Sequence, residues 1–448
     1  MASRILSIAS LFASVALGAV TVTRTDQGPT GYEVTITYQN TSVDSVTIAS
    51  LPHLTDQYST SFWSWSDFDL NEYKPGDFPR DPQDGSYYEM NKTGPGEFTW
   101  TRPFFSGTFQ YSFLLDCAHP SLCNTTTGQE ITDPTNPPFE TVPGSELVST
   151  FQVPYHHDFQ YYPDQNINQD YALPYGNNAS KGTIKIETYR SPGSISPSPG
   201  IHDYVVYLPV GYNANDTSKK YPLLYLSHGG NGAAGDWQNQ AYVSNMLDRL
   251  IGDGHMEPTV VVMPTWYGII ANTTNPDALY LRNYPDSATI ASLYSKYLFP
   301  HIESTYRVSN DSSGRAFAGL SQGSFLTYEF YINYTPYFGY FGIMSGGPAT
   351  NSENDPPALS GYVNASMAAA NPDLLTRGLF LSYGQYDVLF TDTRRLQEAL
   401  DDIGAVYVTR FLPWGFHFWN TWQDAFWHMG RMALWKPIPF TKSTGHGK

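Results

Sequence analysis

The feature that most constrains the fold is the stretch RAFAGLSQGSFLTYEFYIN, residues 315–333. It begins with a short apolar run that predicts a buried strand, and after Gln322 the apolar residues recur at nearly helical spacing. The chain must therefore turn sharply at Ser321, between Gly319 and Gly323. Two glycines there let the strand and the helix approach closely and would push the serine hydroxyl out above a sheet. Ser321 is thus a candidate nucleophile, although a G-x-S-x-G pentad alone could also be an ordinary turn.

The sequence around this turn alternates between strand and helix patterns. The alternation predicts an α/β fold of the α/β-hydrolase type, a mostly parallel central sheet with helices on both faces, over residues 181–440. The expected strands cover residues 183–189, 204–208, 222–227, 259–264, 340–345, 378–384 and 406–412. The expected helices cover residues 240–251, 288–306 and 391–403.

The first third of the chain has a different pattern. Short runs such as YEVTITY (32–38) and GTFQYSFLLD (107–116) alternate apolar and polar residues, and Gly, Pro and Asn clusters separate them. Several short strands without a convincing amphipathic helix predict a β-sandwich over residues 19–148. Residues 149–180, rich in Tyr, Pro, Asn and Asp, are expected to form an irregular connector, and residues 441–448 a polar tail.

The N-terminus predicts secretion. Residues 1–18 combine one arginine, an apolar run and small residues near its end, which is typical of a signal peptide. Because no later stretch is apolar enough to span a membrane, we expect no membrane segment in the mature protein. In an oxidising compartment Cys117 and Cys123, the only cysteines, should form one local disulfide. The candidate glycosylation sequons are Asn40, Asn91, Asn124, Asn178, Asn215, Asn272, Asn310, Asn333 and Asn364.

The charge balance excludes one class of partner. The formal net charge is −17, from 24 Lys and Arg against 41 Asp and Glu. Affinity for nucleic acid comes mainly from basic side chains that neutralise phosphates, so we expect no nucleic-acid partner. The pair His156 and His157 lacks further ligands at a metal-binding spacing and is expected to be structural, so no metal is predicted. The patterns assign no oligomeric state.

A serine nucleophile needs a histidine base and an orienting carboxylate. His417 follows the predicted strand 406–412, at the carboxyl edge of the sheet where such chemistry occurs, and is the expected base. His428 fits a helical face and His446 lies in the polar tail, and the alternative for His417 is a loop histidine packed among aromatic residues. Asp387 follows the apolar strand 378–384 and is the expected acid, whereas Asp392 is better placed in the first turn of a helix.

The developing oxyanion needs two backbone donors. The N–H of Gln322, directly after the serine, is the first candidate, and Gly230, in the loop that follows the strand 222–227, is the second. A glycine turn without this role is the alternative for Gly230. Aromatic residues beside the expected carboxyl-edge loops could line an acyl pocket or only fill the core: Trp266, Tyr267, Trp414, Phe416 and Trp419.

These motifs together resemble carbohydrate esterase family 1, the esterase D-like serine esterases that include feruloyl and acetylxylan esterases. The resemblance covers residues 181–436 and rests on YPLLYLSHGG, LFPHIESTYRV, GLSQGS, YFGIMSGG, GQYD and GFHFWNTW. It implies that Ser321, Asp387 and His417 are the catalytic residues. Gln322 stands where many members have methionine, which leaves the backbone donor in place. FQYSFLLD and ITDPTNPP are similar to early-set immunoglobulin-like domains that precede some of these esterases.

The sequence therefore predicts a secreted serine esterase that works through an acyl-enzyme without metal or cofactor. The resemblance implies an ester substrate linked to plant cell-wall carbohydrate, either feruloyl or acetyl. A siderophore or other small-molecule esterase is the alternative, and a peptidase is a more distant one. The alternative from another class is an inactive hydrolase-like protein that binds carbohydrate or acts in adhesion.

Overall fold

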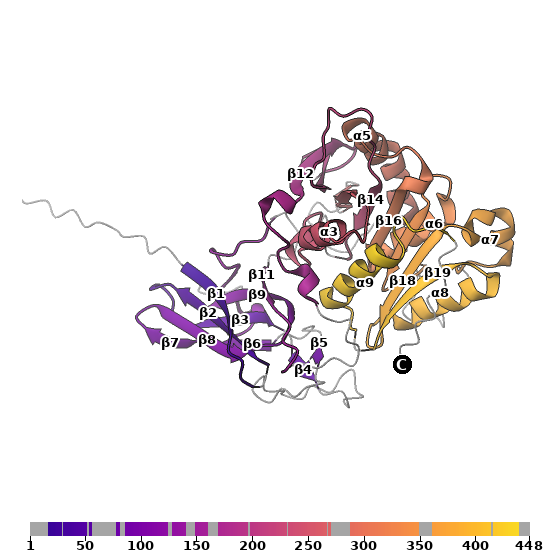
Figure 1. Cartoon of the computed structure of the whole chain (residues 1–448). Helices are drawn as coiled ribbons and strands as arrows, with labels where there is room; N and C mark the ends of the chain where they lie inside the picture. The colour runs from indigo at the N-terminus through magenta and orange to yellow at the C-terminus, as the bar shows by residue number, and fades with distance from the viewer. Residues whose placement is uncertain are drawn as a thin grey trace, which may run out of the picture.

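The computed structural model contains two domains that lie side by side (Figure 1). The structure describes residues 17–28, 30–51, 53–55, 78–80, 86–123, 128–139, 148–159, 169–195, 198–230, 232–266, 268–269, 287–348, 361–413 and 415–438. The first domain is a β-sandwich, and the second is a mixed sheet covered by helices, as the two sequence patterns predicted.

The first sheet of the sandwich is antiparallel. Its order is β1 (Leu17–Arg24), β2 (Tyr32–Gln39), β8 (Glu97–Pro103) and β7 (Asn91–Gly94). In β2 every second side chain is buried, because one face of the strand packs on the core and the other faces outward. The two-residue periodicity of YEVTITY thus reports directly on a half-buried strand.

The second sheet of the sandwich is built around β9, Gly107–Leu115. Its order is β10 (Gln129–Ile131), β9, β3 (Val46–Leu51) and β6 (Ser86–Glu89), and β11 (Ser149–Val153) also pairs with β9. The pairing of β11 extends the sheet past the expected domain boundary at residue 148. Two short strands, β4 (His53–Thr55) and β5 (Phe78–Arg80), pair separately.

The second domain contains an eight-stranded sheet. Five consecutive pairings from β15 to β19 are parallel, and the two pairings at the β12 edge are antiparallel. The strand order is β12 (Thr183–Arg190), β13 (Ile201–Leu208), β15 (Val260–Pro264), β14 (Leu223–Ser227), β16 (Arg315–Leu320), β17 (Tyr340–Met344), β18 (Gly378–Gly384) and β19 (Tyr407–Leu412).

Helices cover both faces of this sheet, so its central strands are buried throughout. One face carries α2 (Asp236–Asn239), α3 (Val243–Gly252) and α9 (Trp419–Met432). The other face carries α4 (Ser287–Leu293), a π-helical turn (Tyr294–Leu298), α5 (Phe299–Thr305), α6 (Gln322–Asn333) and α8 (Phe390–Ile403). The remaining short helices are α1 (Pro120–Cys123), α7 (Ala365–Ala370) and the 3₁₀ turns Gln169–Ala172, Asn178–Ser180, Ser312–Gly314 and Pro372–Leu375.

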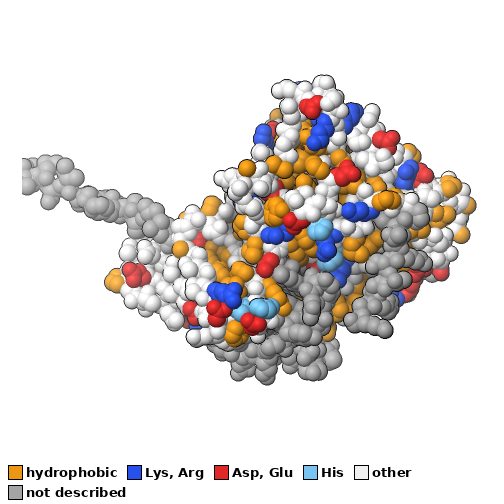
Figure 2. Space-filling view, in the orientation of Figure 1, with side chains coloured by type: hydrophobic (Ala, Val, Ile, Leu, Met, Phe, Trp, Pro, Cys, Tyr) orange, Lys and Arg blue, Asp and Glu red, His pale blue; other side chains and the backbone are white. Residues whose placement is uncertain are grey.

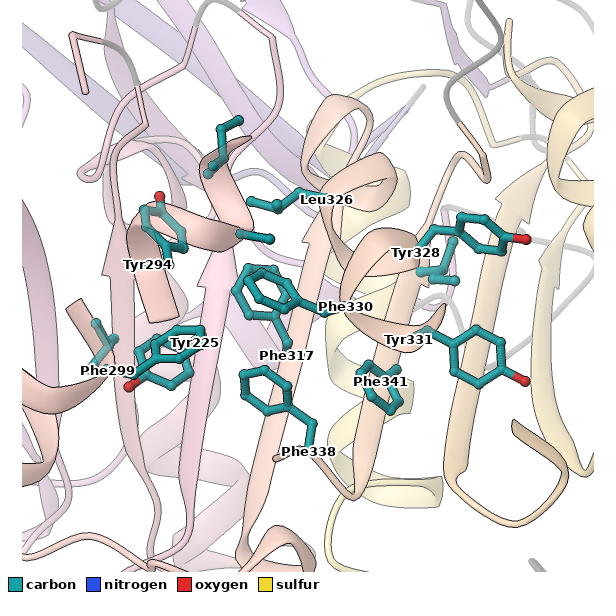
Figure 3. Close-up of a cluster of buried hydrophobic side chains, with 14 of the residues drawn as sticks. Tyr225, Tyr294, Phe299, Phe317, Leu326, Tyr328, Phe330, Tyr331, Phe338 and Phe341 are labelled. Carbon is teal, nitrogen blue, oxygen red and sulfur yellow. The ribbon is translucent and has the colours of Figure 1, made fainter. Parts of the chain in front are cut away.

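Alternate side chains of the central strands enter opposite cores. Leu223 and Tyr225 belong to the core under α6, whereas Leu224 and Leu226 belong to the core under α3 and α9. Figure 3 shows the α6 side, where Phe317 of the central strand meets Phe330 of the helix. Their ring centroids are 4.3 Å apart, and such aromatic burial supplies much of the packing energy of a core.

Two predicted helices differ from the structure in instructive ways. The helix expected over residues 240–251 begins only at Val243, because Tyr242 adopts a left-handed conformation with φ of 49°. The helix expected over residues 288–306 contains the π-helical turn before Pro300. Because proline has no N–H and clashes with the preceding turn, a regular α-helix cannot run through it unchanged.

The structure joins Cys117 and Cys123 in a disulfide across α1. No helix among the described residues has an apolar stretch long enough to cross a membrane. Figure 2 shows basic and acidic side chains interspersed on the visible face, with no broad basic patch.

Candidate active site

Ser321 lies at the sharp turn between β16 and α6. Its backbone φ is 52° and its ψ is −122°, a conformation that a residue with a side chain rarely adopts. The turn is held because the Ser321 N–H donates to the Met344 carbonyl of the adjacent strand at 3.0 Å. The hydroxyl is thereby presented at the carboxyl edge of the sheet, above the first turn of α6.

The glycines on either side of Ser321 are required by close backbone approach. A β-carbon added at Gly319 would lie 2.3 Å from the carbonyl oxygen of Gly323. One added at Gly323 would lie 2.2 Å from the carbonyl oxygen of His228. Because backbone atoms cannot give way as a flexible side chain can, any larger residue would force the turn apart.

Three side chains from different loops form a continuous hydrogen-bond chain. The Nε2 atom of His417 lies 2.8 Å from the Ser321 hydroxyl, and its Nδ1 atom lies 2.8 Å from Oδ1 of Asp387. The Asp387 side chain is fully buried, whereas 15% of the His417 side chain is exposed. This is the nucleophile–base–acid arrangement that acyl transfer needs, with the serine end of the chain nearest to solvent.

The candidate acid is oriented by its own loop. Oδ1 of Asp387 also accepts from the N–H of Leu389 at 2.8 Å, which fixes the carboxylate where β18 leads into α8. Asp392 instead lies in the first turn of α8, as expected, and burial raises the pKa of its carboxyl. Its Oδ1 atom lies 3.4 Å from the Tyr362 hydroxyl, whereas Oδ1 of Asp387 contacts His417.

The other histidines of this region lie elsewhere. His428 is buried on α9, where its Nδ1 lies 2.9 Å from the carbonyl oxygen of Asp424, and burial lowers the pKa of the imidazole. His446 lies outside the described residues. The helical position proposed for His428 thus agrees with its surroundings.

The two expected oxyanion donors lie on adjacent segments. Gln322 is the first residue of α6, so its N–H has no acceptor within the helix. A β-carbon at Gly230 would lie 3.0 Å from Cδ of Gln322, and one at Gly229 would lie 3.1 Å from Cβ of Ser321. The glycine loop therefore lies directly against the serine turn. The backbone N–H groups of Gln322 and Gly230 are thus close to the place where a substrate carbonyl oxygen would need hydrogen-bond donors.

His228, directly before this loop, is a buried support that the sequence did not single out. Its Nδ1 atom lies 2.7 Å from the carbonyl oxygen of Gly229, and its ring stacks on Trp266 with centroids 4.8 Å apart. Burial lowers the pKa of His228 to about 3. The imidazole is therefore neutral in the folded protein under ordinary conditions, and no uncompensated positive charge lies behind the loop.

The five candidate pocket aromatics fall into two groups. Trp266, Phe416 and Trp419 are all at least nine-tenths buried, and they pack respectively on His228, Tyr386 and Trp237. Their packing role is thus evident from their contacts. Tyr267 and Trp414 lie outside the described residues.

Trp422 is a neighbour of the candidate base that sequence reasoning missed. Its ring meets the His417 ring edge-on, with centroids 5.0 Å apart, and its indole N–H donates to the Ser345 hydroxyl at 3.0 Å. Trp422 is the last residue of the stretch GFHFWNTW. The many aromatic residues in that stretch are the sequence feature that could have indicated a ring packed against His417.

His156 and His157 lie far along the chain from this site. His156 is buried and its Nε2 lies 2.8 Å from Oδ1 of Asp26, which is a structural contact, whereas His157 is exposed. Together with Asp158 they offer ligand atoms within 4.8 Å of one another, the one such group found among the described residues.

The sequon asparagines that the structure describes are accessible. Asn91, Asn178, Asn215, Asn310, Asn333 and Asn364 are exposed, and Asn40 is half-buried. Asn124 and Asn272 lie outside the described residues.

Comparison with known proteins gives this site its context. A family model described as "Putative esterase" matches residues 202–432, slightly more than half of the chain. The chain belongs to this esterase family. The match includes Ser321, Asp387 and His417, and it confirms the resemblance to esterases that the motifs predicted.

Two curated relatives of this esterase share part of its sequence. One is an endo-1,4-beta-xylanase/feruloyl esterase of Xylanibacter ruminicola, 31% identical over 160 residues, which cover 35% of this chain and 21% of the relative. The other is endo-1,4-beta-xylanase Y of Acetivibrio thermocellus, 34% identical over 149 residues, which cover 32% of this chain and 12% of the relative. The aligned part thus spans about a fifth or less of either relative.

A solved structure resembles both domains of this esterase. The enterobactin esterase of Shigella flexneri, solved in the presence of enterobactin, covers 89% of this chain and 92% of its own, with a TM-score of 0.51 and 15% identity. At that identity the likeness concerns the fold, and it supports the arrangement of a β-sandwich followed by an α/β-hydrolase domain.

Proposed function

We propose that this esterase is a serine carboxylic-ester hydrolase in which Ser321, His417 and Asp387 form the catalytic triad. The observation that carries the proposal is the pair of 2.8 Å contacts that link the serine hydroxyl, the imidazole and the buried carboxylate. All three groups leave the carboxyl ends of β16, β18 and β19, the edge at which sheets of this type place their chemistry.

The first half of the reaction forms an acyl-enzyme. Nε2 of His417 takes the proton of the Ser321 hydroxyl while Oγ attacks the ester carbonyl carbon. The N–H groups of Gln322 and Gly230 stabilise the oxyanion of the tetrahedral intermediate. The protonated His417 then gives its proton to the alcohol oxygen, the carbon–oxygen bond breaks and the alcohol leaves, while Asp387 keeps the imidazolium oriented and stabilised.

The second half releases the acid. His417 takes a proton from water, and the resulting hydroxide attacks the acyl carbon. The second tetrahedral intermediate collapses, His417 returns the proton to Ser321, and the carboxylic acid departs. The chain's own side chains balance every proton transfer, so the proposed mechanism needs no metal and no cofactor.

The substrate we favour is a feruloyl or acetyl ester of plant cell-wall polysaccharide. The motif resemblance and the feruloyl esterase relative at 31% identity support this choice. A siderophore ester is the second candidate, because the two-domain likeness to an enterobactin esterase spans nearly the whole chain. A secreted, glycosylated protein fits the first candidate, and the N-terminal pattern together with the exposed sequons supports that localisation.

The test compares the wild type with Ser321→Ala on feruloylated xylan oligosaccharides, acetylated xylan oligosaccharides, enterobactin and a peptide panel, with chromatography of the products. We expect ferulic or acetic acid from the wild type and none from the variant. Hydrolysis of enterobactin alone would select the second candidate. Equal activity of Ser321→Ala, or oligosaccharide binding without hydrolysis by the wild type, would overturn the proposed mechanism.

Secretion has a separate test. Expression of the full chain in a glycosylating eukaryotic host should place the protein in the medium, with a new N-terminus near residue 19 and a mass that falls after treatment with an N-glycosidase. Retention of residues 1–18 by the cell-associated protein would contradict the proposed signal peptide.

A further inference from the structure

Strand β9 of the sandwich is buried on both of its faces, unlike β2. Phe109, Tyr111 and Phe113 enter the sandwich core. The opposite face of β9 includes Thr108 and Gln110, which are polar and yet 2% and 7% exposed. Burial of polar side chains is costly unless they find hydrogen-bond partners, so this face must be matched by another polar surface.

That surface belongs to the esterase domain. The amide nitrogen of Gln423, a fully buried residue of α9, donates to the Thr108 hydroxyl at 3.0 Å and to the Ala241 carbonyl at 3.0 Å. Gln110 donates to the side chain of Gln240. Gln423 thus joins three segments, namely α9, the turn before α3 and the sandwich.

Strand β11 reinforces the same contact. The Thr150 hydroxyl donates to the Asn239 carbonyl at 2.9 Å, and the Tyr242 hydroxyl lies 3.1 Å from the Thr150 carbonyl. Tyr242 is the residue whose left-handed backbone delays the start of α3. A strained residue persists only when its surroundings hold it, and here the sandwich supplies part of that hold.

The two parts of the esterase domain that contact the sandwich, α9 and residues 239–242, adjoin the proposed catalytic loops. Helix α9 begins just after His417, and Trp422, the neighbour of Gln423, packs edge-on against the His417 ring. Helix α2 follows the Gly230 loop, and the indole N–H of Trp237 donates to the Ser227 carbonyl before that loop at 3.0 Å. Figure 1 shows α9 and α3 on the side of the second domain that is turned toward the sandwich.

We propose that the β-sandwich is a positioning element of the active site, which acts through the contact between Thr108 and Gln423 to hold the helix behind His417. Thr108 and Gln423 are positioning residues, because neither touches the reacting atoms. The inference rests on the proposed triad. It assigns to the sandwich a role in catalysis that needs no carbohydrate binding.

The test uses the full chain with Thr108→Val, which keeps the shape of the side chain and removes the acceptor. Gln423 retains its bond to Ala241, so the variant should fold. The readouts are kcat and KM on the best ester from the panel, and the rate of labelling by a fluorophosphonate, in which Oγ of the serine attacks phosphorus and fluoride leaves. Thermal unfolding measures stability in parallel.

We expect kcat and the labelling rate to fall about tenfold to a hundredfold in Thr108→Val with KM nearly unchanged, because small misplacements of a catalytic group are costly. Thr108→Ser, which restores the hydroxyl, should recover most of the rate. The matched control is Thr35→Val, which removes the Thr35–Thr101 hydroxyl contact of 3.0 Å in the other sheet of the sandwich and should leave the labelling rate unchanged.

The outcomes separate the two proposals. The proposed triad is contradicted if the fluorophosphonate does not label the wild type, or if it labels Ser321→Ala as fast as the wild type. Specific labelling of Ser321 together with a wild-type rate in folded Thr108→Val overturns only the positioning role. An equal fall of the labelling rate in Thr108→Val and Thr35→Val would assign the effect to the stability of the sandwich. It would also overturn the positioning role.

Discussion

The serine and the histidine of the proposed triad are held in place by different means. Ser321 lies in a turn whose shape is set by its immediate neighbours, since Gly319 meets Gly323 and Gly323 meets the backbone of His228. His417 lies in the connection between β19 and α9, and its position depends on contacts made by the flanking strand and helix. One residue is fixed locally and the other from a distance.

The distant hold on His417 has two sides. Arg410 of β19 donates two hydrogen bonds to the Asp424 carboxylate of α9, at 2.8 and 3.2 Å. This pair joins the strand before His417 to the helix after it. On the neighbouring position of the same helix, Gln423 reaches the sandwich. The serine turn thus depends on close backbone contacts, whereas the position of His417 depends on side-chain contacts between several parts of the fold.

The largest expected effect tests whether the two residues act as one unit. His417→Ala should lower kcat/KM by about 10⁴- to 10⁶-fold, and the double variant with Ser321→Ala should lose little more, because members of a triad are strongly non-additive. Steady-state kinetics on the best ester measure both. His157→Ala, at an exposed histidine, is the control and should keep full activity. Independent, multiplicative losses would show that the two side chains do not act together.

The local hold is tested by Gly323→Ala. The added β-carbon would lie 2.2 Å from the His228 carbonyl oxygen, so we expect a loss of about 1–3 kcal/mol in unfolding free energy and of about a hundredfold in activity. Gly347→Ala is the control, because its nearest atom would be an ordinary 3.5 Å away. Denaturant unfolding and ester hydrolysis measure the two effects. A Gly323→Ala protein as active as the control would contradict the local mechanism.

The contacts around His417 that come from the strand and the helix are tested by Asp424→Asn, which removes the buried carboxylate charge that contacts Arg410. Breaking a buried pair from one side costs about 3–5 kcal/mol, and we expect activity to fall about tenfold as the His417 connection loosens. Glu398→Gln removes the partner of exposed Arg394 and should change stability by less than about 0.5 kcal/mol. If activity per folded molecule is unaffected by Asp424→Asn, the pair serves stability alone.

The last prediction concerns stability rather than activity, at the loop behind the proposed oxyanion site. Burial lowers the pKa of His228 to about 3, against 6.5 for a free histidine, so the unfolded chain takes up the proton first as pH falls. Stability should therefore decrease from about pH 6.5 to about pH 3, by up to about 1.4 kcal/mol per pH unit from this residue, and then level off.

Denaturant unfolding at several pH values checks this expectation. His228→Asn can still bond the Gly229 carbonyl but has no group that titrates in this range, so its stability should vary less with pH than that of the wild type. Parallel curves for the two proteins would show that His228 does not contribute.

The sequence by itself determined the order of elements and the serine turn. Apolar runs and helical spacing predicted each strand of the esterase domain to within a few residues. The central strands could be predicted because burial between two helical layers requires continuous apolar runs. Ser321 could be identified because the apolar run, the two flanking glycines and the helical spacing that indicate its turn all lie within residues 315–333. Asp387 and His417 could be proposed because each follows a predicted strand at the carboxyl edge of the sheet.

Only the tertiary structure decided what holds the histidine and why some polar residues are buried. Gln423 and Thr108 are separated by 315 positions in the chain, and neither stands in a recognisable motif. Nothing in the local pattern of β9 distinguishes a polar face turned to water from one turned to a second domain. That distinction arises when the domains pack, because hydrogen bonding between buried side chains depends on distances in space, which sequence neighbours do not set.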